Sequence, residues 1–239
     1  MRTGIIQTRG LGDIVIAAPI AMHFIEKGHE VYWPIDSDFI DPFSYALPEI
    51  KFIPVDKSIT GSDSADFFIE HPKRMLADRG CQSVHILYSF LTGYQFGHVH
   101  LANSLTFDAY KYAVSGVPFE KKWTLKIRRN PLREAEIFNI LNINPSEKYS
   151  VIHENGSNYE TNLSEKIEDK NIKIIKISNI TDNFLDWLGV IENSSEAHLI
   201  DSVYSNIVDQ LGFEIKKYYY PRSNVSFTPV MRTHWHFGK

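Results

Sequence analysis

Cysteine is almost missing from this chain of 239 residues, and long hydrophobic runs are missing altogether. Cys81 is the single cysteine, which excludes an intrachain disulfide and a zinc cluster built from cysteines. No apolar stretch approaches the roughly 20 residues that a membrane-spanning helix needs, and the first residues lack the layout of a signal peptide. We therefore expect a soluble, cytoplasmic protein in a reducing compartment.

The chain also lacks a large excess of charge of either sign. It carries 25 Lys and Arg residues against 29 Asp and Glu residues, which gives a formal net charge of −4. A protein that binds nucleic acid over a broad surface is usually basic. The composition therefore disfavours nucleic acid as a partner. Nucleic acid could bind only in a local basic cleft.

The most informative residues present lie near the N-terminus. A short apolar strand at residues 4–6 leads into Arg9-Gly10-Leu11-Gly12-Asp13, and an apolar helical pattern over 14–27 follows. A strand, a glycine-rich turn and a helix begin a Rossmann-like unit. Gly10 and Gly12 allow close approaches that a Cβ would block, and the first helical amides suit an anion. Asp13 places a carboxylate there, so it is either a general base or only a helix cap.

The dinucleotide-binding fingerprint is incomplete, because the position of its third glycine is Val15. An acidic residue, Asp36, does follow the second expected strand at about the distance of a ribose-binding carboxylate. An NAD-dependent oxidoreductase therefore stays open as a weaker alternative.

Strand-like and helix-like segments alternate along the chain, which predicts a layered α/β fold. An amphipathic helix over 132–141 is followed by turn residues at 144–146. We therefore predict two domains, 1–145 and 146–239, each wound from β-strands and helices. The tail 223–239 has no clear period and is a candidate to pack back on the first domain.

Further motifs follow the N-terminal one in order. Ala17-Ala18-Pro19 lies on the first helix, His153-Glu154-Asn155-Gly156-Ser157 follows a strand, and residues 191–205 read IENSSEAHLIDSVYS. With these motifs the chain resembles the lipopolysaccharide heptosyltransferase-like glycosyltransferases (glycosyltransferase family 9). The resemblance implies the GT-B architecture, in which two Rossmann-like domains face each other across a cleft, here with a reduced second domain.

The resemblance also implies an activity, that of a hexosyl- or heptosyltransferase. A sugar would pass from a nucleotide-sugar donor to a hydroxyl group of a glycan, a glycolipid or another acceptor. The N-terminal domain would hold the acceptor, with Asp13 as the general base that removes the hydroxyl proton. The C-terminal domain would hold the donor, and neither a cofactor nor a metal ion is expected.

The candidate donor and phosphate site gathers glycines, polar side chains and helix-terminal amides. Glu196 is a candidate for the donor ribose, with a solvated glutamate at a helix end as the alternative. The full set is Gly10, Gly12, His153, Asn155, Gly156, Ser157, Asn179, Glu196, Asp201 and Ser202.

The chain departs from the family pattern at two points. The family's lysine in the phosphate turn is not evident after Ser157, and its histidine-containing sequence after Asp-Ser is absent at 201–205. These departures keep three alternatives open: a protein without catalysis that binds a nucleotide or glycan, the NAD-dependent oxidoreductase, and sugar transfer to modified DNA.

Overall fold

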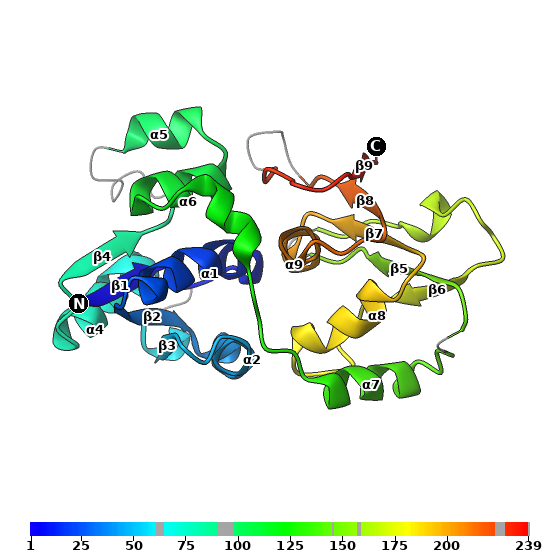
Figure 1. The fold of residues 1–239 in the computed structure, drawn as a ribbon, viewed down its shortest axis with the longest axis horizontal. Coiled ribbons are helices and arrows are strands. Elements are labelled where there is room, and N and C mark those ends of the chain that lie inside the picture. The colour runs from blue at the N-terminus through cyan, green and yellow to red at the C-terminus, as the bar shows by residue number, and fades with distance from the viewer. Residues whose placement is uncertain (61–64, 90–97, 145, 157–158, 223–227, 239) are drawn as a thin grey trace. The chain divides into compact units, whose positions relative to one another are not determined.

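The computed structural model describes residues 1–60, 65–89, 98–144, 146–156, 159–222 and 228–238 (Figure 1). The chain forms two compact units: unit 1 is Met1–Ile127 with Ser226–Val230, and unit 2 is Arg128–Val225 with Met231–Lys239. The division falls before helix α7 (Pro131–Ile140), which the sequence boundary at 145 assigns to the first domain. This helix packs on helix α8 (Leu188–Glu192), and that contact places it in unit 2.

Unit 1 is built on a parallel sheet with the order β3-β2-β1-β4. Its strands are β1 (Arg2–Ile6), β2 (Glu30–Asp36), β3 (Lys51–Val55) and β4 (Ser83–Ile86). Helices cover both faces of the sheet. Gly4 meets Leu76 of helix α4 on one face, and on the other His85 stacks on Phe24 of helix α1. The apolar residues of the central strands β1 and β2 follow from this burial on both sides, whereas the edge strands β3 and β4 include exposed residues.

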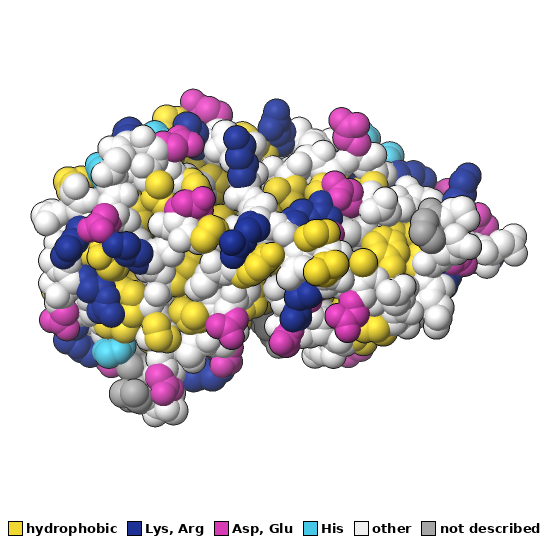
Figure 2. All heavy atoms as spheres, turned by 60° about the horizontal axis from the view of Figure 1, so that its bottom comes forward, with side chains coloured by type: hydrophobic (Ala, Val, Ile, Leu, Met, Phe, Trp, Pro, Cys, Tyr) yellow, Lys and Arg dark blue, Asp and Glu magenta, His cyan; other side chains and the backbone are white. Residues whose placement is uncertain are grey.

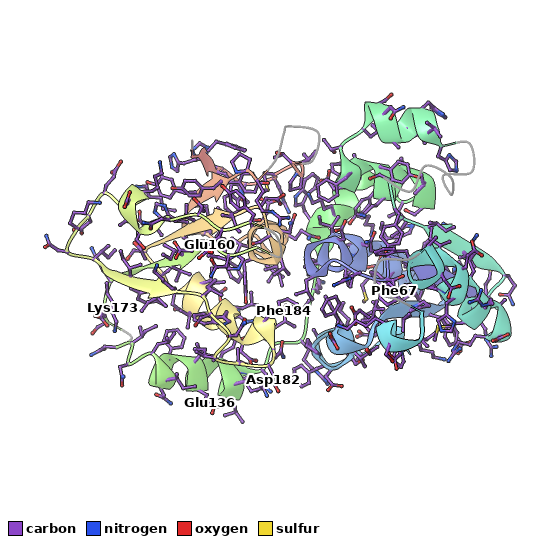
Figure 3. All side chains as sticks on the ribbon, turned by 180° about the vertical axis from the view of Figure 1, so that it is seen from behind. Phe67, Glu136, Glu160, Lys173, Asp182 and Phe184 are labelled. Carbon is purple, nitrogen blue, oxygen red and sulfur yellow. The ribbon has the colours of Figure 1, made fainter. Side chains whose placement is uncertain are left out.

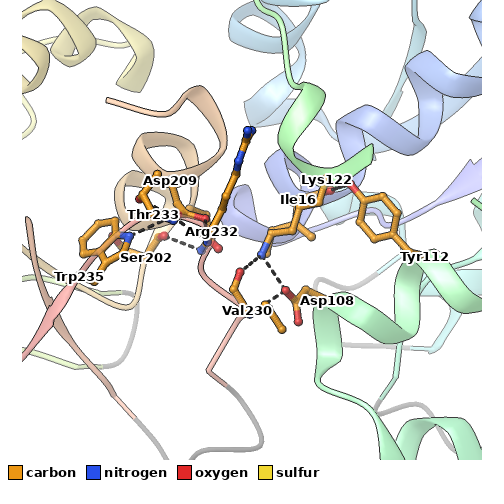
Figure 4. A network of polar contacts seen from close by, with 11 residues as sticks. Ile16, Asp108, Tyr112, Lys122, Ser202, Asp209, Val230, Arg232, Thr233 and Trp235 are labelled. Carbon is orange, nitrogen blue, oxygen red and sulfur yellow. Dashed lines mark hydrogen bonds and ion pairs between the residues drawn. The ribbon is translucent and has the colours of Figure 1, made fainter. Parts of the chain in front are cut away.

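The helices of unit 1 include one long element, α1 (Leu11–Glu26), which is buried from Ile14 to Ala21. Helix α6 (Phe107–Ser115) packs against α1, and the Tyr112 hydroxyl donates to the carbonyl of Ile16 at 2.8 Å (Figure 4). The other helices are α2 (Ile40–Ala46), α3 (Lys57–Thr60), α4 (His71–Asp78) and α5 (Val99–Ser104), with 3-10 turns at Ser37–Phe39 and Phe119–Thr124 and a π-helical turn at Asp66–Glu70.

Unit 2 contains a second parallel sheet, with the order β6-β5-β7-β8-β9. Its strands are β5 (Tyr149–His153), β6 (Lys173–Lys176), β7 (Glu196–Ile200), β8 (Lys216–Tyr220) and β9 (His236–Phe237). Helix α9 (Val203–Leu211) follows β7 and ends at Gly212, whose φ is +71°. The described part of the β5–β6 connection contains one 3-10 turn, Ser164–Lys166, and another such turn, Phe184–Trp187, precedes α8.

Helix α7 shows how unit 2 uses an amphipathic element. Asn130 caps it by accepting from the amide of Arg133, and Pro131 occupies its first turn. Ile137 is buried, whereas Glu136 lies on the exposed side of the helix (Figure 3).

One face of the protein mixes charges of both signs. On the face in Figure 2, Lys and Arg side chains are interspersed with Asp and Glu side chains. Over the described residues, no helix has the length and apolar character that crossing a membrane requires.

Candidate functional site

Each sheet reverses its strand order at one place. In unit 1, β2 and β3 lie on one side of β1 and β4 on the other, so the reversal falls between β1 and β4. In unit 2, β6 lies on one side of β5 and β7 lies on the other, so the reversal falls between β5 and β7. In open α/β sheets, ligands bind outside the carboxyl ends of the strands at such switch points. The two switch points are therefore the first places to look for a site.

Asp13 lies at the switch point of unit 1, in the first turn of α1. Gly10 is the residue before this helix and has a φ of +87°, a conformation that favours glycine. A Cβ at Gly10 would lie 2.6 Å from Oδ2 of Asp13. Gly10 is thus needed for the turn and for the space that the carboxylate occupies, whereas Gly12 lies inside α1.

Lys111 of α6 supplies the cation that faces Asp13. Its Nζ lies 2.9 Å from Oδ1 of Asp13 and donates to Oε1 of Gln7 at 2.7 Å and to the Leu87 carbonyl at 3.2 Å. The Lys111 side chain is 2% exposed, but that of Asp13 is 36% exposed. The ammonium is therefore closed off by protein, while the carboxylate remains open to a ligand.

The turn that carries Asp13 is held by buried hydrogen bonds. The Tyr88 hydroxyl accepts from the amides of Thr8 and Arg9, at 2.7 and 3.1 Å. Burial raises the pKa of Tyr88, so its hydroxyl keeps its proton. Trp33 donates from Nε1 to the Gln7 carbonyl at 3.1 Å. These contacts fix the backbone between β1 and α1 and with it the base of the site.

The switch point of unit 2 brings together His153, Asp201 and Ser202. Nδ1 of His153 and the Ser202 hydroxyl lie 3.0 Å apart, and Ser202 precedes α9, with its amide donating to the Ser205 hydroxyl. Burial, together with the nearby cation of Arg222, lowers the pKa of His153 to about 4. The imidazole is therefore neutral at pH 7 and acts as a hydrogen-bonding group, not as a charge.

Arg222, which follows β8, brings a positive charge to this edge. Its Nη2 lies 3.8 Å from Oδ2 of Asp201. A Cβ at Gly156 would lie 2.9 Å from its Nη1, so the guanidinium passes directly over this glycine. Arg222 is not among the residues predicted from the sequence, although it is a cation just after a strand of the second half.

Glu196, another candidate of unit 2, does not lie with His153, Asp201 and Ser202. Glu196 is the first residue of β7, so it lies at the amino end of the strand, opposite His153 and Ser202. There its carboxylate accepts from the Ser150 hydroxyl at 2.8 Å, and we withdraw it from the donor site.

The other candidates lie in turns beyond the strands. Asn179 lies in an exposed bend beyond β6, and Asn155 forms an isolated bridge with Glu160. The Gly156 amide already donates to the Tyr159 carbonyl. Ser157 lies outside the described residues.

The expectation that no metal ion is needed assumed that no Asp-x-Asp pair lies near a strand end, and that assumption was wrong, because Asp36-Ser37-Asp38 lies at the end of β2. Asp36 is buried, accepts from the Asp38 amide at 3.1 Å and faces Arg9 at 3.9 Å, and Asp38 pairs with Lys57. Because Asp36 serves the chain itself, it is a poor ligand for a ribose. Within the described residues, no group of three or more His, Cys, Asp or Glu side chains could hold a metal ion.

Comparisons with known proteins show one consistent likeness. No protein-family model and no curated protein matches the chain. Among solved structures, a family 9 glycosyltransferase from Veillonella parvula matches with a TM-score of 0.66 at 12% identity, over 99% of this chain and 86% of that one. ADP-heptose lipopolysaccharide heptosyltransferase II from E. coli matches with a TM-score of 0.62 at 10% identity, over 99% and 90%.

A third match is the E. coli heptosyltransferase WaaC, solved with ADP-2-deoxy-2-fluoro heptose, with a TM-score of 0.54, 11% identity, and 100% and 93% coverage. The chain has the fold of these glycosyltransferases. The resemblance noted from the motifs is thereby confirmed at the level of the fold, and the two parallel sheets agree with the predicted α/β class.

Proposed function

We propose that this protein transfers a glycosyl group from a nucleotide-sugar donor to an acceptor hydroxyl, with Asp13 as the general base. The observation that carries the proposal is the exposed carboxylate of Asp13 at the switch point of unit 1, set on a turn with buried hydrogen bonds. A carboxylate in this position accepts a proton from a hydroxyl group within hydrogen-bond reach. The shared fold with heptosyltransferases supports the same reading.

The reaction assigned to these residues balances as a displacement. Asp13 takes the proton of the acceptor hydroxyl while that oxygen forms a bond to the anomeric carbon of the donor sugar. The bond between the anomeric carbon and the diphosphate oxygen breaks, and its electron pair leaves with the nucleoside diphosphate. No redox partner or metal ion enters this scheme.

We assign the diphosphate to the switch point of unit 2. Arg222 supplies a positive charge there, and the N-terminus of α9 adds the partial charge of a helix end. Two of the matching structures, WaaC and the dodecameric heptosyltransferase TibC, were solved with ADP-linked heptose donors, which makes an ADP-sugar the first donor to test here.

The proposal is tested with purified protein and a panel of ADP-heptose, UDP-glucose, GDP-mannose and dTDP-rhamnose. Release of the nucleoside diphosphate is measured with water and with a panel of sugars that offer acceptor hydroxyl groups. Asp13→Asn should lower kcat by about 100-fold or more, since a positioned general base contributes about 10²–10⁴-fold. Donor binding, measured by calorimetry, should persist in this variant.

Arg222→Met should weaken donor binding by about tenfold or more, because a hydrogen bond to a charged group contributes about 1.5–3 kcal/mol. The matched control is Lys173→Met, a cation at the amino end of β6 that pairs with Glu147 (Figure 3), and it should leave donor binding unchanged.

Other outcomes separate the alternatives. Donor binding without turnover of any donor would favour a binding protein, and binding of NAD alone would favour an oxidoreductase. Equal kcat for Asp13→Asn and the unmutated protein would refute the role of Asp13.

A further inference from the structure

Buried lysines are costly unless their ammonium groups are hydrogen-bonded, so each one calls for a physical explanation. The Lys111 side chain is 2% exposed and its three donor positions meet three acceptors: Asp13, Gln7 and the Leu87 carbonyl. Two of these acceptors belong to residues that directly follow β1 and β4. The ammonium is therefore anchored to the carboxyl ends of both strands that border the switch point.

The anchored ammonium contacts only one oxygen of Asp13. Oδ1 lies 2.9 Å from Nζ of Lys111, whereas Oδ2 lies over Gly10. Because the ion pair occupies Oδ1, the oxygen left to meet an acceptor hydroxyl is Oδ2.

We infer that Lys111 is the positioning residue of the general base, which holds Asp13 by Oδ1 so that Oδ2 receives the acceptor proton. The inference rests on the proposed function. Lys111 touches neither substrate in this scheme and acts only through Asp13. Gln7 supports it from the other side, since its Oε1 accepts from Lys111 while its Nε2 donates to the Arg9 carbonyl at 2.8 Å.

A second lysine–aspartate pair of unit 1 provides a control for the role of Lys111. Lys122 is a second buried lysine of unit 1, and it pairs with Asp108 at 2.7 Å. Both members of that pair are closed to solvent, with side chains 1% and 0% exposed. Lys122→Met therefore removes a buried ammonium without touching Asp13, which makes it the matched control.

The test uses the whole chain of 239 residues with the same donors and acceptors. Lys111→Met should lower kcat by about 100-fold, as misplacement of a catalytic group by about 1 Å can do, and should change the donor KM by less than twofold. Lys111→Arg keeps a cation and should retain more kcat than Lys111→Met. Lys122→Met should lower the unfolding temperature without a selective loss of kcat.

The double variant Asp13→Asn/Lys111→Met decides whether Lys111 acts through Asp13. It removes both charges, so it leaves no unpaired ammonium in the interior. If Lys111 works only through Asp13, the double variant is as slow as Asp13→Asn, because residues that act as a unit are not additive.

Three outcomes would overturn the inference. An unchanged kcat in folded Lys111→Met refutes it while Asp13 keeps its role. A further loss of kcat in the double variant, relative to Asp13→Asn, shows that Lys111 acts elsewhere. Absence of turnover by the unmutated protein with every donor refutes the proposed function and this inference together.

Discussion

Helix α6 contributes one residue to each of two lysine–aspartate pairs, Lys111 to the pair with Asp13 and Asp108 to the pair with Lys122. In the second pair both side chains are buried, whereas in the first only the ammonium is, because the Asp13 side chain is 36% exposed. A carboxylate that solvent can reach can also exchange a proton with a ligand. The difference in exposure therefore separates a pair suited to chemistry from a pair suited to stability.

The Lys122–Asp108 pair, called the closed pair below, joins two distant segments of unit 1. Nζ of Lys122 donates to the carbonyl of Val230 at 2.6 Å, and the amide of Val230 donates to Oδ2 of Asp108 at 2.9 Å (Figure 4). The pair thus holds the segment that ends at Val230 against α6, which gives it a structural task.

The largest expected effect comes from breaking the closed pair on one side. Lys122→Met leaves the Asp108 carboxylate buried without its ammonium, and such a change costs about 3–5 kcal/mol in the free energy of unfolding. Replacing both partners, as in Asp108→Leu/Lys122→Met, should cost less, because no uncompensated charge remains. Urea unfolding of the three proteins measures this, and a double variant less stable than Lys122→Met would contradict the comparison.

A smaller effect is expected from placing a Cβ against the Lys111–Asp13 pair, whose carboxylate is open to solvent. Gly10→Ala puts a Cβ 2.6 Å from Oδ2 of Asp13 at a φ of +87°, and the left-handed conformation alone costs about 1–2 kcal/mol. Gly116→Ala is the matched control, because Gly116 has a φ of +68° and no atom within 4 Å of its Cβ position. Gly10→Ala should lose more stability than Gly116→Ala, because Gly10 has a ψ of 97° outside the left-handed helical region that Gly116 adopts, and only Gly10→Ala should lose nucleoside diphosphate release. Equal activity in the two variants would show that Oδ2 has no special role.

Much of the fold follows from local sequence signals. Residues 51–55 and 149–153 predict β3 and β5 with their observed bounds, because β-branched and aromatic residues favour strands. The turn at Gly10 is also readable, since a glycine between a strand and a helix commonly takes a positive φ. These signals lie within a few residues of the element that they specify.

The partners in the candidate site could not be predicted in the same way. Lys111 lies on a helix with an amphipathic pattern, where a lysine is normally solvated, and its burial depends on contacts with β1 and β4. Glu196 is the first residue of β7, so its side chain lies at the amino end of the sheet, away from the other candidates. The edge of a sheet on which a residue lies depends on strand bounds and direction.

Another buried carboxylate, Asp209 on α9, extends the comparison to unit 2. It accepts from the amides of Arg232 and Thr233, the Thr233 hydroxyl and the Trp235 indole (Figure 4). Burial pushes the pKa of Asp209 up, but these hydrogen bonds outweigh it, so that the pKa lies below its ordinary value. Asp209 is therefore stabilised as an anion by neutral donors, whereas Asp108 faces an ammonium.

The smallest expected effect follows from this difference and depends on pH. A carboxyl group with a lowered pKa in the folded state contributes stability that is fully present above its unfolded pKa of about 3.9. That contribution is lost as the pH falls through the folded pKa, so the protection of the amides of Arg232 and Thr233 against hydrogen exchange, relative to an unfolded chain, should fall selectively below about pH 4. Asp209→Asn should cost about 1–2 kcal/mol at pH 7 and remove this acid sensitivity. If Asp209→Asn loses protection at these amides in the same way, a group other than Asp209 causes the acid sensitivity of Arg232 and Thr233. The neutral donors around Asp209 would then not play the part that the ammonium plays for Asp108.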